Sequence, residues 1–198
     1  MRLACLDLEG VLVPEIWHNV AARTGIEELR LTTRDIPDYD ELMRYRLTIL
    51  DTHRVPLRTI QDVISGMEPL PGAYDFLARL RETMQVIMLS DTFEEFARPL
   101  MAQLDYPTLF CNSLVVDRDT NMIRNYQLRQ KNGKFHAVTA FEEIGFEVYA
   151  AGDSYNDLAM IRAATKGAFF TPPESIVSEN PDLPVCMTYD ELFAFLTA

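Results

Sequence analysis

The sequence contains few cysteines, and they form no recognisable pattern. Among its 198 residues there are three, Cys5, Cys111 and Cys186, which lie far apart and are odd in number. There is no CxxC pair, so neither a zinc ribbon nor a disulfide scaffold is expected. We therefore interpret all three as buried free thiols.

Basic residues are also scarce. The chain has 18 Lys and Arg against 30 Asp and Glu, which gives a formal net charge of −12. A chain this acidic is a poor candidate for nonspecific binding to nucleic acid or to anionic lipid. An anionic substrate would therefore need a local positive site.

Several sequence signals are missing. No apolar run approaches the length that crosses a bilayer. The apolar stretch at the start of the sequence is interrupted by Asp7 and Glu9, which makes it too short for a signal peptide. There is no P-loop glycine pattern, which disfavours an ATP-dependent kinase. We expect a cytoplasmic protein that binds neither membrane nor nucleic acid.

What the sequence does contain is an alternation of short apolar runs and helical patterns. Apolar residues make up 48% of the chain, as in an ordinary globular domain. Five short runs have the character of buried parallel strands, namely residues 3–6, 85–89, 147–151, 167–170 and 184–187. Helical patterns follow at 39–51, 73–84, 154–164 and 188–196. This alternation predicts an α/β fold with a Rossmann-like open, mostly parallel sheet.

Two segments interrupt this alternation of strands and helices. Residues 14–70 carry several helical stretches and no clear strand, and they make the connection between the first two core strands too long for a simple crossover. We expect them to form an inserted helical cap, with residues 1–13 and 71–198 forming the core domain. Residues 110–132 contain two strand-like runs around a polar turn, which predicts a small β-hairpin.

Acids and hydroxyls follow three of the predicted strands. Asp7 and Glu9 follow the first, Ser90 and Asp91 the second, and a Gly-Asp-Ser-Tyr-Asn-Asp run beginning at Gly152 follows the third. In a doubly wound sheet, ligands bind at the carboxyl ends of the strands, so these groups are expected to converge. Singly, each would be an ordinary cap or turn residue.

The chemistry of such a cluster is specific. Carboxylates held together repel one another and favour a bound cation, and oxygen ligands alone select a hard ion such as Mg²⁺. One carboxylate can attack phosphorus and form an aspartyl-phosphate. A second can protonate the leaving oxygen and later activate the acceptor. A hydroxyl and a lysine can hold the remaining phosphoryl oxygens.

These residues resemble a known family. The run Asp7-Leu-Glu-Gly-Val11, Ser90 after Leu89, Lys134 and the run from Gly152 to Asp157 are similar to the four motifs of the haloacid dehalogenase-like phosphohydrolases, in particular the phosphoserine phosphatase branch. The family's first motif has Asp where this chain has Glu9. With Asp91-Thr92 in place of the branch's usual two glycines, this resembles a bifunctional subgroup that also transfers phosphate from phosphoserine to homoserine.

The resemblance implies a role for each site residue. It makes Asp7 the nucleophile and a Mg²⁺ ligand, and gives Glu9 the acid/base role plus a main-chain metal contact. Asp153 and Asp157 are implied at the metal site, and Ser90 and Lys134 at the phosphoryl group. Lys131, three residues before Lys134, is the alternative, but Gly133-Lys134 opens a helix in the family's manner. The implied substrate contacts are Glu15, Arg46, Ser90, Asp91, Lys134 and Asn156.

Phosphoserine also carries an ammonium and a carboxylate. By resemblance, Glu15 would pair with the ammonium and Arg46 would grip the carboxylate through two hydrogen bonds. Alternatively, Glu15 is a helix-start acid and Arg46 a solvated helix charge. Arg44 should point to another face of the helix and is the natural control.

The resemblance thus implies a Mg²⁺-dependent phosphoserine phosphatase of serine and threonine biosynthesis, with homoserine as a second acceptor. Three rivals stay open at this point. They are a phosphatase for another small phosphorylated metabolite, a dehalogenase that uses the same aspartate on carbon, and a non-enzymatic phospho-receiver or binding domain.

Overall fold

The chain is built around one seven-stranded sheet. The computed structural model describes residues 1–33, 35–36 and 38–198. The strand order is β4-β3-β2-β1-β5-β6-β7, and within these described residues only the β3–β4 pair is antiparallel. The strands are β1 (Arg2–Leu6), β2 (Gln85–Phe93), β3 (Thr108–Val116), β4 (Ile123–Gln127), β5 (Glu147–Gly152), β6 (Lys166–Phe170) and β7 (Val185–Cys186). The predicted α/β class and its mostly parallel sheet are confirmed.

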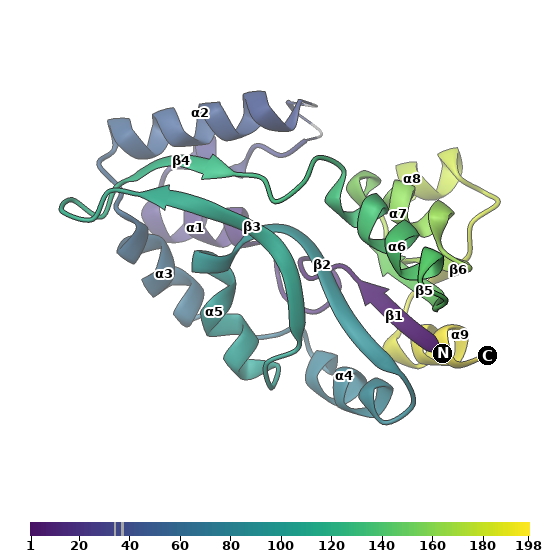
Figure 1. The fold of residues 1–198 in the computed structure, drawn as a ribbon. Helices are drawn as coiled ribbons and strands as arrows, with labels where there is room; N and C mark the ends of the chain where they lie inside the picture. The colour runs from purple at the N-terminus through teal and green to yellow at the C-terminus, as the bar shows by residue number, and fades with distance from the viewer. Residues whose placement is uncertain (34, 37) are drawn as a thin grey trace.

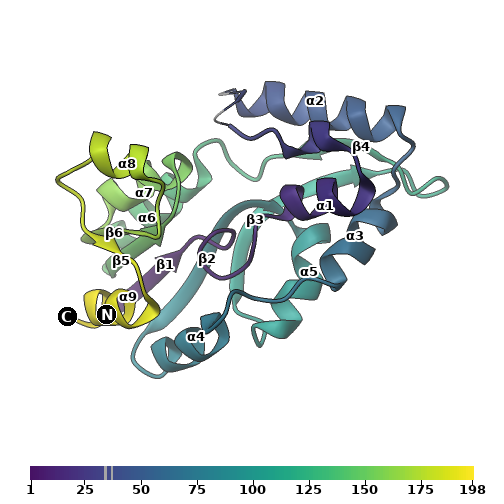
Figure 2. The ribbon, with the colours of Figure 1, turned by 180° about the vertical axis from the view of Figure 1, so that it is seen from behind.

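Helices cover both faces of this sheet because the central strands are apolar on both sides. In β1, Leu3 and Cys5 pack into one hydrophobic cluster, whereas Ala4 and Leu6 pack into the other. One face carries α4 (Ala73–Arg81), α5 (Glu94–Gln103) and α9 (Tyr189–Thr197), and the other carries α6 (Gly133–Glu143), α7 (Leu158–Ala163) and α8 (Glu174–Glu179). Both termini lie beside α9 (Figure 1, Figure 2).

In the described part of the segment between β1 and β2, loops join elements that are all helical. It holds α1 (Ile16–Thr24), a 3₁₀ turn (Glu27–Arg30), α2 (Tyr39–Thr52) and α3 (Leu57–Ser65). These helices share a continuous hydrophobic core with α5 and the sheet. The cap boundaries at residues 14 and 70 stay predictions, because that core runs unbroken from the cap helices into the rest of the fold.

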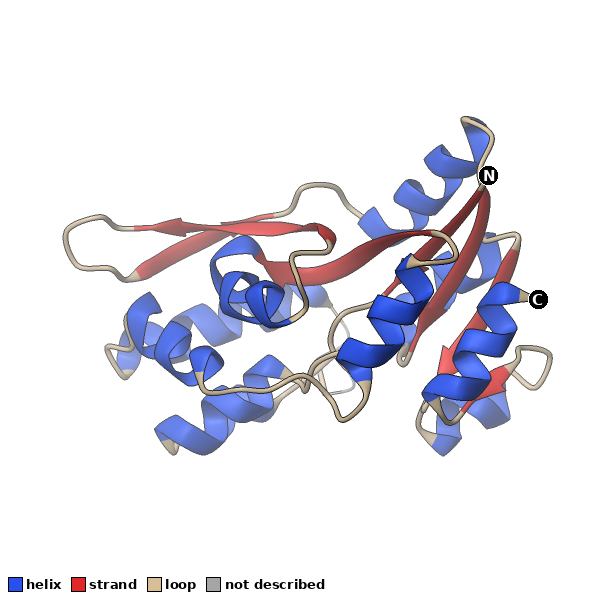
Figure 3. Cartoon of the chain, turned by 90° about the horizontal axis from the view of Figure 1, so that it is seen from below, coloured by secondary structure: helices blue, strands red, loops and turns tan. Residues whose placement is uncertain are grey.

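The predicted hairpin is present, but its first strand has a second role. The first half of β3 pairs in parallel with β2, and its second half pairs antiparallel with β4. The hairpin therefore extends away from the core sheet (Figure 3). It reaches the cap, where β4 runs beside α2 (Figure 1). At its turn, the carbonyl of Asn121 accepts the Leu57 N–H at 2.8 Å and its side-chain oxygen accepts the Arg58 N–H at 2.8 Å, at the start of α3.

The second strand is longer than its apolar run predicts. It continues through Ser90 and Asp91 to Phe93, and its register against β3 shifts between Leu89 and Phe93. Such an irregularity bends a strand and redirects its side chains. The motif at Ser90 therefore lies within the strand, not after it. No helix in the described part of the chain is long and apolar enough to cross a membrane.

Candidate active site

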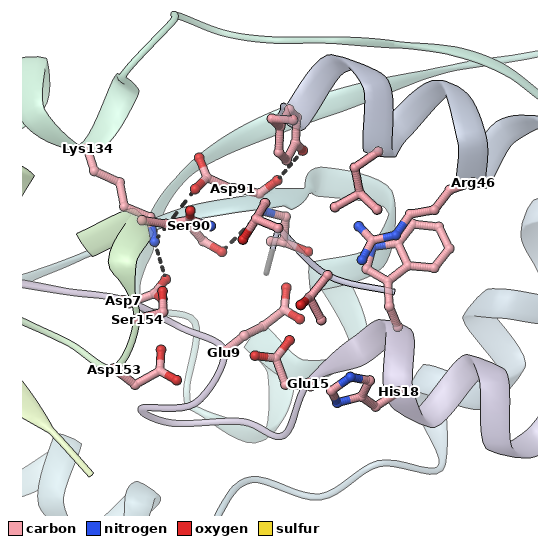
Figure 4. Close-up of a pocket in the computed structure, with 17 residues that line it drawn as sticks. Asp7, Glu9, Glu15, His18, Arg46, Ser90, Asp91, Lys134, Asp153 and Ser154 are labelled. Atoms are coloured by element: carbon pink, nitrogen blue, oxygen red, sulfur yellow. Dashed lines mark hydrogen bonds and ion pairs between the residues drawn. The ribbon is translucent and has the colours of Figure 1, made fainter. Parts of the chain in front are cut away.

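A cavity of about 340 Å³ opens at the carboxyl edge of the sheet beneath the cap. All of the predicted site residues line it except Asp157, which is fully buried beside it. They are Asp7, Glu9, Glu15, Arg46, Ser90, Asp91, Lys134, Asp153 and Asn156. Arg46 lies across the cavity from Asp7 and Lys134 (Figure 4). The structure thus brings together groups that follow β1 and β5, groups within β2, and groups of the helix α6 and the cap.

Asp7 and Lys134 form the buried centre of the site. The Lys134 Nζ atom lies 2.9 Å from Asp7 Oδ1 and 2.7 Å from Asp157 Oδ1. The N–H of Leu8 also donates to Asp7 Oδ1, at 2.7 Å. Asp7 Oδ2 accepts no hydrogen bond from the residues that the structure describes. The rival lysine, Lys131, is exposed and does not line the cavity.

Asp157 holds the loop after β5 in place. Its Oδ2 atom accepts the N–H groups of Asp153 and Ser154, each at 3.0 Å, and the Ser154 hydroxyl at 3.1 Å. Because its other oxygen accepts from Lys134, both oxygens of this buried carboxylate are already engaged. A Cβ atom at Gly152 would lie only 2.2 Å from Asp157, so this close packing requires glycine there.

The carboxylates of the site repel one another. Asp7, Asp153 and Asp157 each offer an oxygen, and these oxygens lie within 4.8 Å of one another. Burial raises the pKa of Asp153 to about 7, and the Asp157 charge adds to this. Burial and Asp157 likewise raise the pKa of Asp7, although Lys134 opposes the effect. An oxygen-only cluster of this charge fits a hard divalent cation.

Lys134 remains charged in spite of its burial. Burial by itself lowers the pKa of an ammonium group. Asp157, Asp7 and Asp91 together outweigh that effect, so the pKa of Lys134 rises well above its ordinary value. The site therefore contains one fixed positive charge at its centre, in contact with three carboxylates.

Ser90 and Asp91 reach the cavity because of the irregular register of β2. The Thr92 N–H donates to Ser90 Oγ at 3.2 Å, which orients the hydroxyl. The Asp91 carbonyl accepts the Asn112 side-chain amide at 3.1 Å. The Asp91 carboxylate is 42% exposed and lies 3.8 Å from Lys134 Nζ, within reach of a bound ligand.

Glu9 is held where the chain enters the cap. Its Oε2 atom accepts the Ile16 N–H at 2.9 Å, at the first residue of α1. Burial raises the pKa of Glu9 to about 7, and the Glu15 charge adds to this. Glu9 can therefore either donate or accept a proton near neutral pH. Glu15 is the N-cap residue of α1, although its side chain makes no cap hydrogen bond, so both views of it, as substrate contact and as helix-start acid, stay predictions.

Arg46 is a buried cation that has no counterion among the residues the structure describes. Its guanidinium lies 4.5 Å from the centre of the Trp17 ring, and one NH2 group donates to the Leu31 carbonyl at 2.8 Å. The Nε atom is buried and has no hydrogen-bond partner among the described residues. Nor does any carboxylate of the described part of the chain lie within ion-pair distance.

Burial disfavours the charged form of Arg46. It lowers the pKa of Arg46 to about 10, even though Glu9, Tyr39 and Glu15 oppose the change. The view of Arg46 as a solvated surface charge does not fit this environment. Arg44, in contrast, is exposed and does not line the cavity, so it keeps its value as a control.

Several lining residues were not predicted as site residues, among them Trp17, His18 and Tyr39. Trp17 packs edge-on against Phe96, with ring centroids 5.5 Å apart, as expected for cap packing. The guanidinium of Arg46 also lies over the face of its ring. His18 shares a hydrogen bond with the Arg30 carbonyl and lines the cavity. Tyr39 also lines it. Its spacing of two helical turns from Arg46 is the one sequence signal that could have identified it.

Comparison with known proteins places this site in a family. A model of the haloacid dehalogenase-like hydrolases matches residues 1–165. The chain is 54% identical to "Phosphoserine phosphatase" of Pseudomonas syringae pv. tomato over 97% of its own length and 81% of that protein. It is 53% identical to "Phosphoserine phosphatase ThrH" of Pseudomonas aeruginosa, over 97% of its length and 93% of that protein.

A solved structure supports the same fold. The crystal structure of a phosphoserine phosphatase from T. onnurineus matches with a TM-score of 0.73 at 23% identity, covering 99% of this chain and 94% of that one. The resemblance to the phosphoserine phosphatase branch is therefore confirmed by sequence as well as by fold. Its relatives identify the chain as a phosphatase, and it belongs to the haloacid dehalogenase-like hydrolase family.

Proposed function

We propose that this protein is a Mg²⁺-dependent phosphoserine phosphatase that works through an aspartyl-phosphate on Asp7, and that it also transfers the phosphoryl group to homoserine. Arg46 carries the proposal. Its buried guanidinium, with no counterion in the described part of the chain, lies across a small cavity from a buried aspartate and lysine. This arrangement suits a substrate with a phosphate at one end and a carboxylate at the other. The names of the two bacterial relatives support the same substrate.

Asp7 is suited to attack phosphorus. Its Oδ1 atom is fixed by Leu8 and Lys134, which leaves Oδ2 as the nucleophilic oxygen. In the first step an Asp7 oxygen forms a bond to phosphorus while the bond from phosphorus to the serine oxygen breaks. Glu9 gives its proton to that leaving oxygen, which its pKa of about 7 makes feasible near neutral pH. Lys134 and Ser90 hold the remaining phosphoryl oxygens.

The acidic cluster fits the metal. Asp7 and Asp153, with the main-chain carbonyl of Glu9, would hold Mg²⁺, while the predicted ligand Asp157 contributes by fixing Lys134 and the Asp153 loop. When bound, the ion neutralises the carboxylates and the phosphate so that two anions can approach each other. In this proposal residues 1–13 and 71–198 perform the chemistry and residues 14–70 recognise the amino-acid part of the substrate.

The second step releases the phosphoryl group to an acceptor. Glu9 takes the proton of a water molecule as its oxygen attacks phosphorus, and the bond from phosphorus to Asp7 breaks. Homoserine is an alcohol like serine, with the same ammonium and carboxylate, so it can use Glu15 and Arg46 in the same way. A site that lets serine leave can, in the reverse direction, let such an alcohol attack.

The test measures both products. Phosphoserine is supplied with Mg²⁺, with chelator, and with Mg²⁺ plus excess homoserine, and free phosphate and phosphohomoserine are quantified. We expect turnover that depends on Mg²⁺ and a share of phosphohomoserine that rises with acceptor concentration. Absence of phosphohomoserine at saturating homoserine would leave only a phosphatase.

A panel of other small phosphorylated metabolites tests the alternative substrates. A single labelled aspartate without turnover of any member would instead indicate a receiver domain. The variant Glu9→Asp tests the account of transfer, since the shorter acid should change the ratio of the two products. An unchanged ratio would mean that Glu9 does not determine the partition.

A further inference from the structure

The hydroxyl of Tyr39 bridges the cap and the core at the cavity. It donates to the main-chain carbonyl of Asp91 at 3.1 Å, joining the first residue of α2 to the irregular part of β2. The two residues are 52 positions apart in the chain. Burial raises the pKa of Tyr39, and the Asp91 charge adds to this, so the hydroxyl keeps its proton and remains a donor at any ordinary pH.

Both ends of this hydrogen bond are themselves held. The Asp91 carbonyl also accepts the Asn112 amide at 3.1 Å, which ties it to β3. On the cap side, the Tyr39 ring packs edge-on against Tyr126 of the hairpin, with ring centroids 6.0 Å apart. Tyr126 in turn donates a hydrogen bond to Asp40, the next residue of α2. The start of α2 is therefore fixed against both β2 and the hairpin.

Helix geometry connects this contact to Arg46. Tyr39, Leu42 and Arg46 follow a spacing of three and then four residues, so they lie on one face of α2, and all three line the cavity. Arg46 is two helical turns from Tyr39 on the same rigid helix. A shift of the helix start relative to β2 therefore moves Arg46 relative to the phosphoryl end of the cavity, at Asp7, Ser90 and Lys134.

We propose that Tyr39 is a positioning residue, whose hydrogen bond to the Asp91 carbonyl sets the separation between Arg46 and the phosphoryl-binding groups and thereby favours substrates of phosphoserine length. The inference rests on the proposed function, because it takes Arg46 as the carboxylate-binding group. The inference adds Tyr39 to the proposed site as a residue that touches no reacting atom. Its loss should affect only substrates that reach both ends of the cavity.

The variant Tyr39→Phe removes the hydroxyl and keeps the ring. We expect the KM for phosphoserine to rise about three- to tenfold, as for one lost hydrogen bond, with kcat nearly unchanged. Hydrolysis of 4-nitrophenyl phosphate, which has no carboxylate, should stay within about twofold of wild type. The matched control is Tyr45→Phe, the same change on the same helix at a residue that does not line the cavity, and it should alter neither substrate.

A double-variant cycle tests whether the effect passes through Arg46. If it does, Tyr39→Phe should add little to Arg46→Ala, because the group that it positions is already absent. If the two substitutions act independently, so that their fold-changes multiply in the double variant, the proposal is overturned. So would an equal loss for phosphoserine and 4-nitrophenyl phosphate, since this would indicate an effect on the chemistry or the fold.

A fluorescence measurement separates this inference from the proposed function. Trp17 is the only tryptophan of the chain and packs between Arg46 and Phe96 of α5, at the junction of cap and core. Acrylamide should quench it more strongly in Tyr39→Phe than in wild type or Tyr45→Phe. If Arg46→Ala leaves phosphoserine turnover intact, the substrate assignment fails, whereas unchanged quenching and unchanged KM in Tyr39→Phe overturn the role of Tyr39.

Discussion

The buried charge of Arg46 gives the sharpest prediction for this enzyme. Burial lowers the pKa of Arg46 to about 10. At 1.36 kcal/mol per pKa unit, this shift from the ordinary pKa of arginine corresponds to roughly 3 kcal/mol of unfavourable burial of the charge in the free protein. A substrate carboxylate beside the guanidinium would offset much of that cost, and its loss should weaken binding by about 2–4 kcal/mol. Arg46→Ala should therefore lower kcat/KM for phosphoserine by about 30- to 1000-fold.

The assay compares two substrates that share only the phosphate. Steady-state kinetics with phosphoserine and with 4-nitrophenyl phosphate are measured for wild type, Arg46→Ala, Arg46→Lys and Arg44→Ala. The loss in Arg46→Ala should fall on phosphoserine and spare the simple ester. Arg46→Lys should recover only part of the activity, because lysine keeps the charge but not the planar fork that binds a carboxylate through two hydrogen bonds.

Two results would refute this reasoning. An equal loss for both substrates would mean that Arg46 supports the fold or the chemistry rather than the carboxylate. A larger effect from the exposed Arg44 would mean that the wrong face of α2 has been assigned to the substrate.

Three further predictions concern the acidic cluster and the loops around it. Asp7→Asn should abolish turnover, and beryllium fluoride, which mimics a phosphoryl group, should modify wild type but not the variant; turnover within about tenfold of wild type would exclude Asp7 as the nucleophile. Gly10→Ala should lower the free energy of unfolding by about 1–3 kcal/mol, because Gly10 has a φ of +76° and its Cβ would lie 2.4 Å from the Asp153 carboxyl carbon. Gly25→Ala, at φ +72° but with open space around it, should cost less in the same urea titration. Because the pKa of Asp153 is raised to about 7 in the folded protein, the stabilisation from its protonated form is present at low pH and lost as pH rises through 7. The protein in chelator should therefore melt at a lower temperature at pH 8 than at pH 5, with Mg²⁺ restoring stability at pH 8; a melting temperature that rises with pH in chelator would contradict this.

The amino-acid sequence by itself determined the class of the fold and the centre of the site. Buried parallel strands are short apolar runs, and this pattern is local in the sequence. Since parallel strands share one carboxyl edge, the positions of Asp7, Ser90 and Asp153 along the chain already predicted that they meet. The choice of Lys134 over Lys131 came from the family resemblance, in which Gly133-Lys134 opens a helix, and α6 does begin at Gly133.

Only the tertiary structure decided how those groups are held. The shifted register of β2, the dual pairing of β3 and the contact of Tyr39 with Asp91 all join segments far apart in the chain. Periodicity within a segment carries no information about them, because a register shift depends on the partner strand and a buried charge depends on what surrounds it. Arg46 is the clearest case. The sequence alone could not decide whether it is a surface charge or a substrate contact, whereas the structure buries it against Trp17, without a counterion in the described part of the chain.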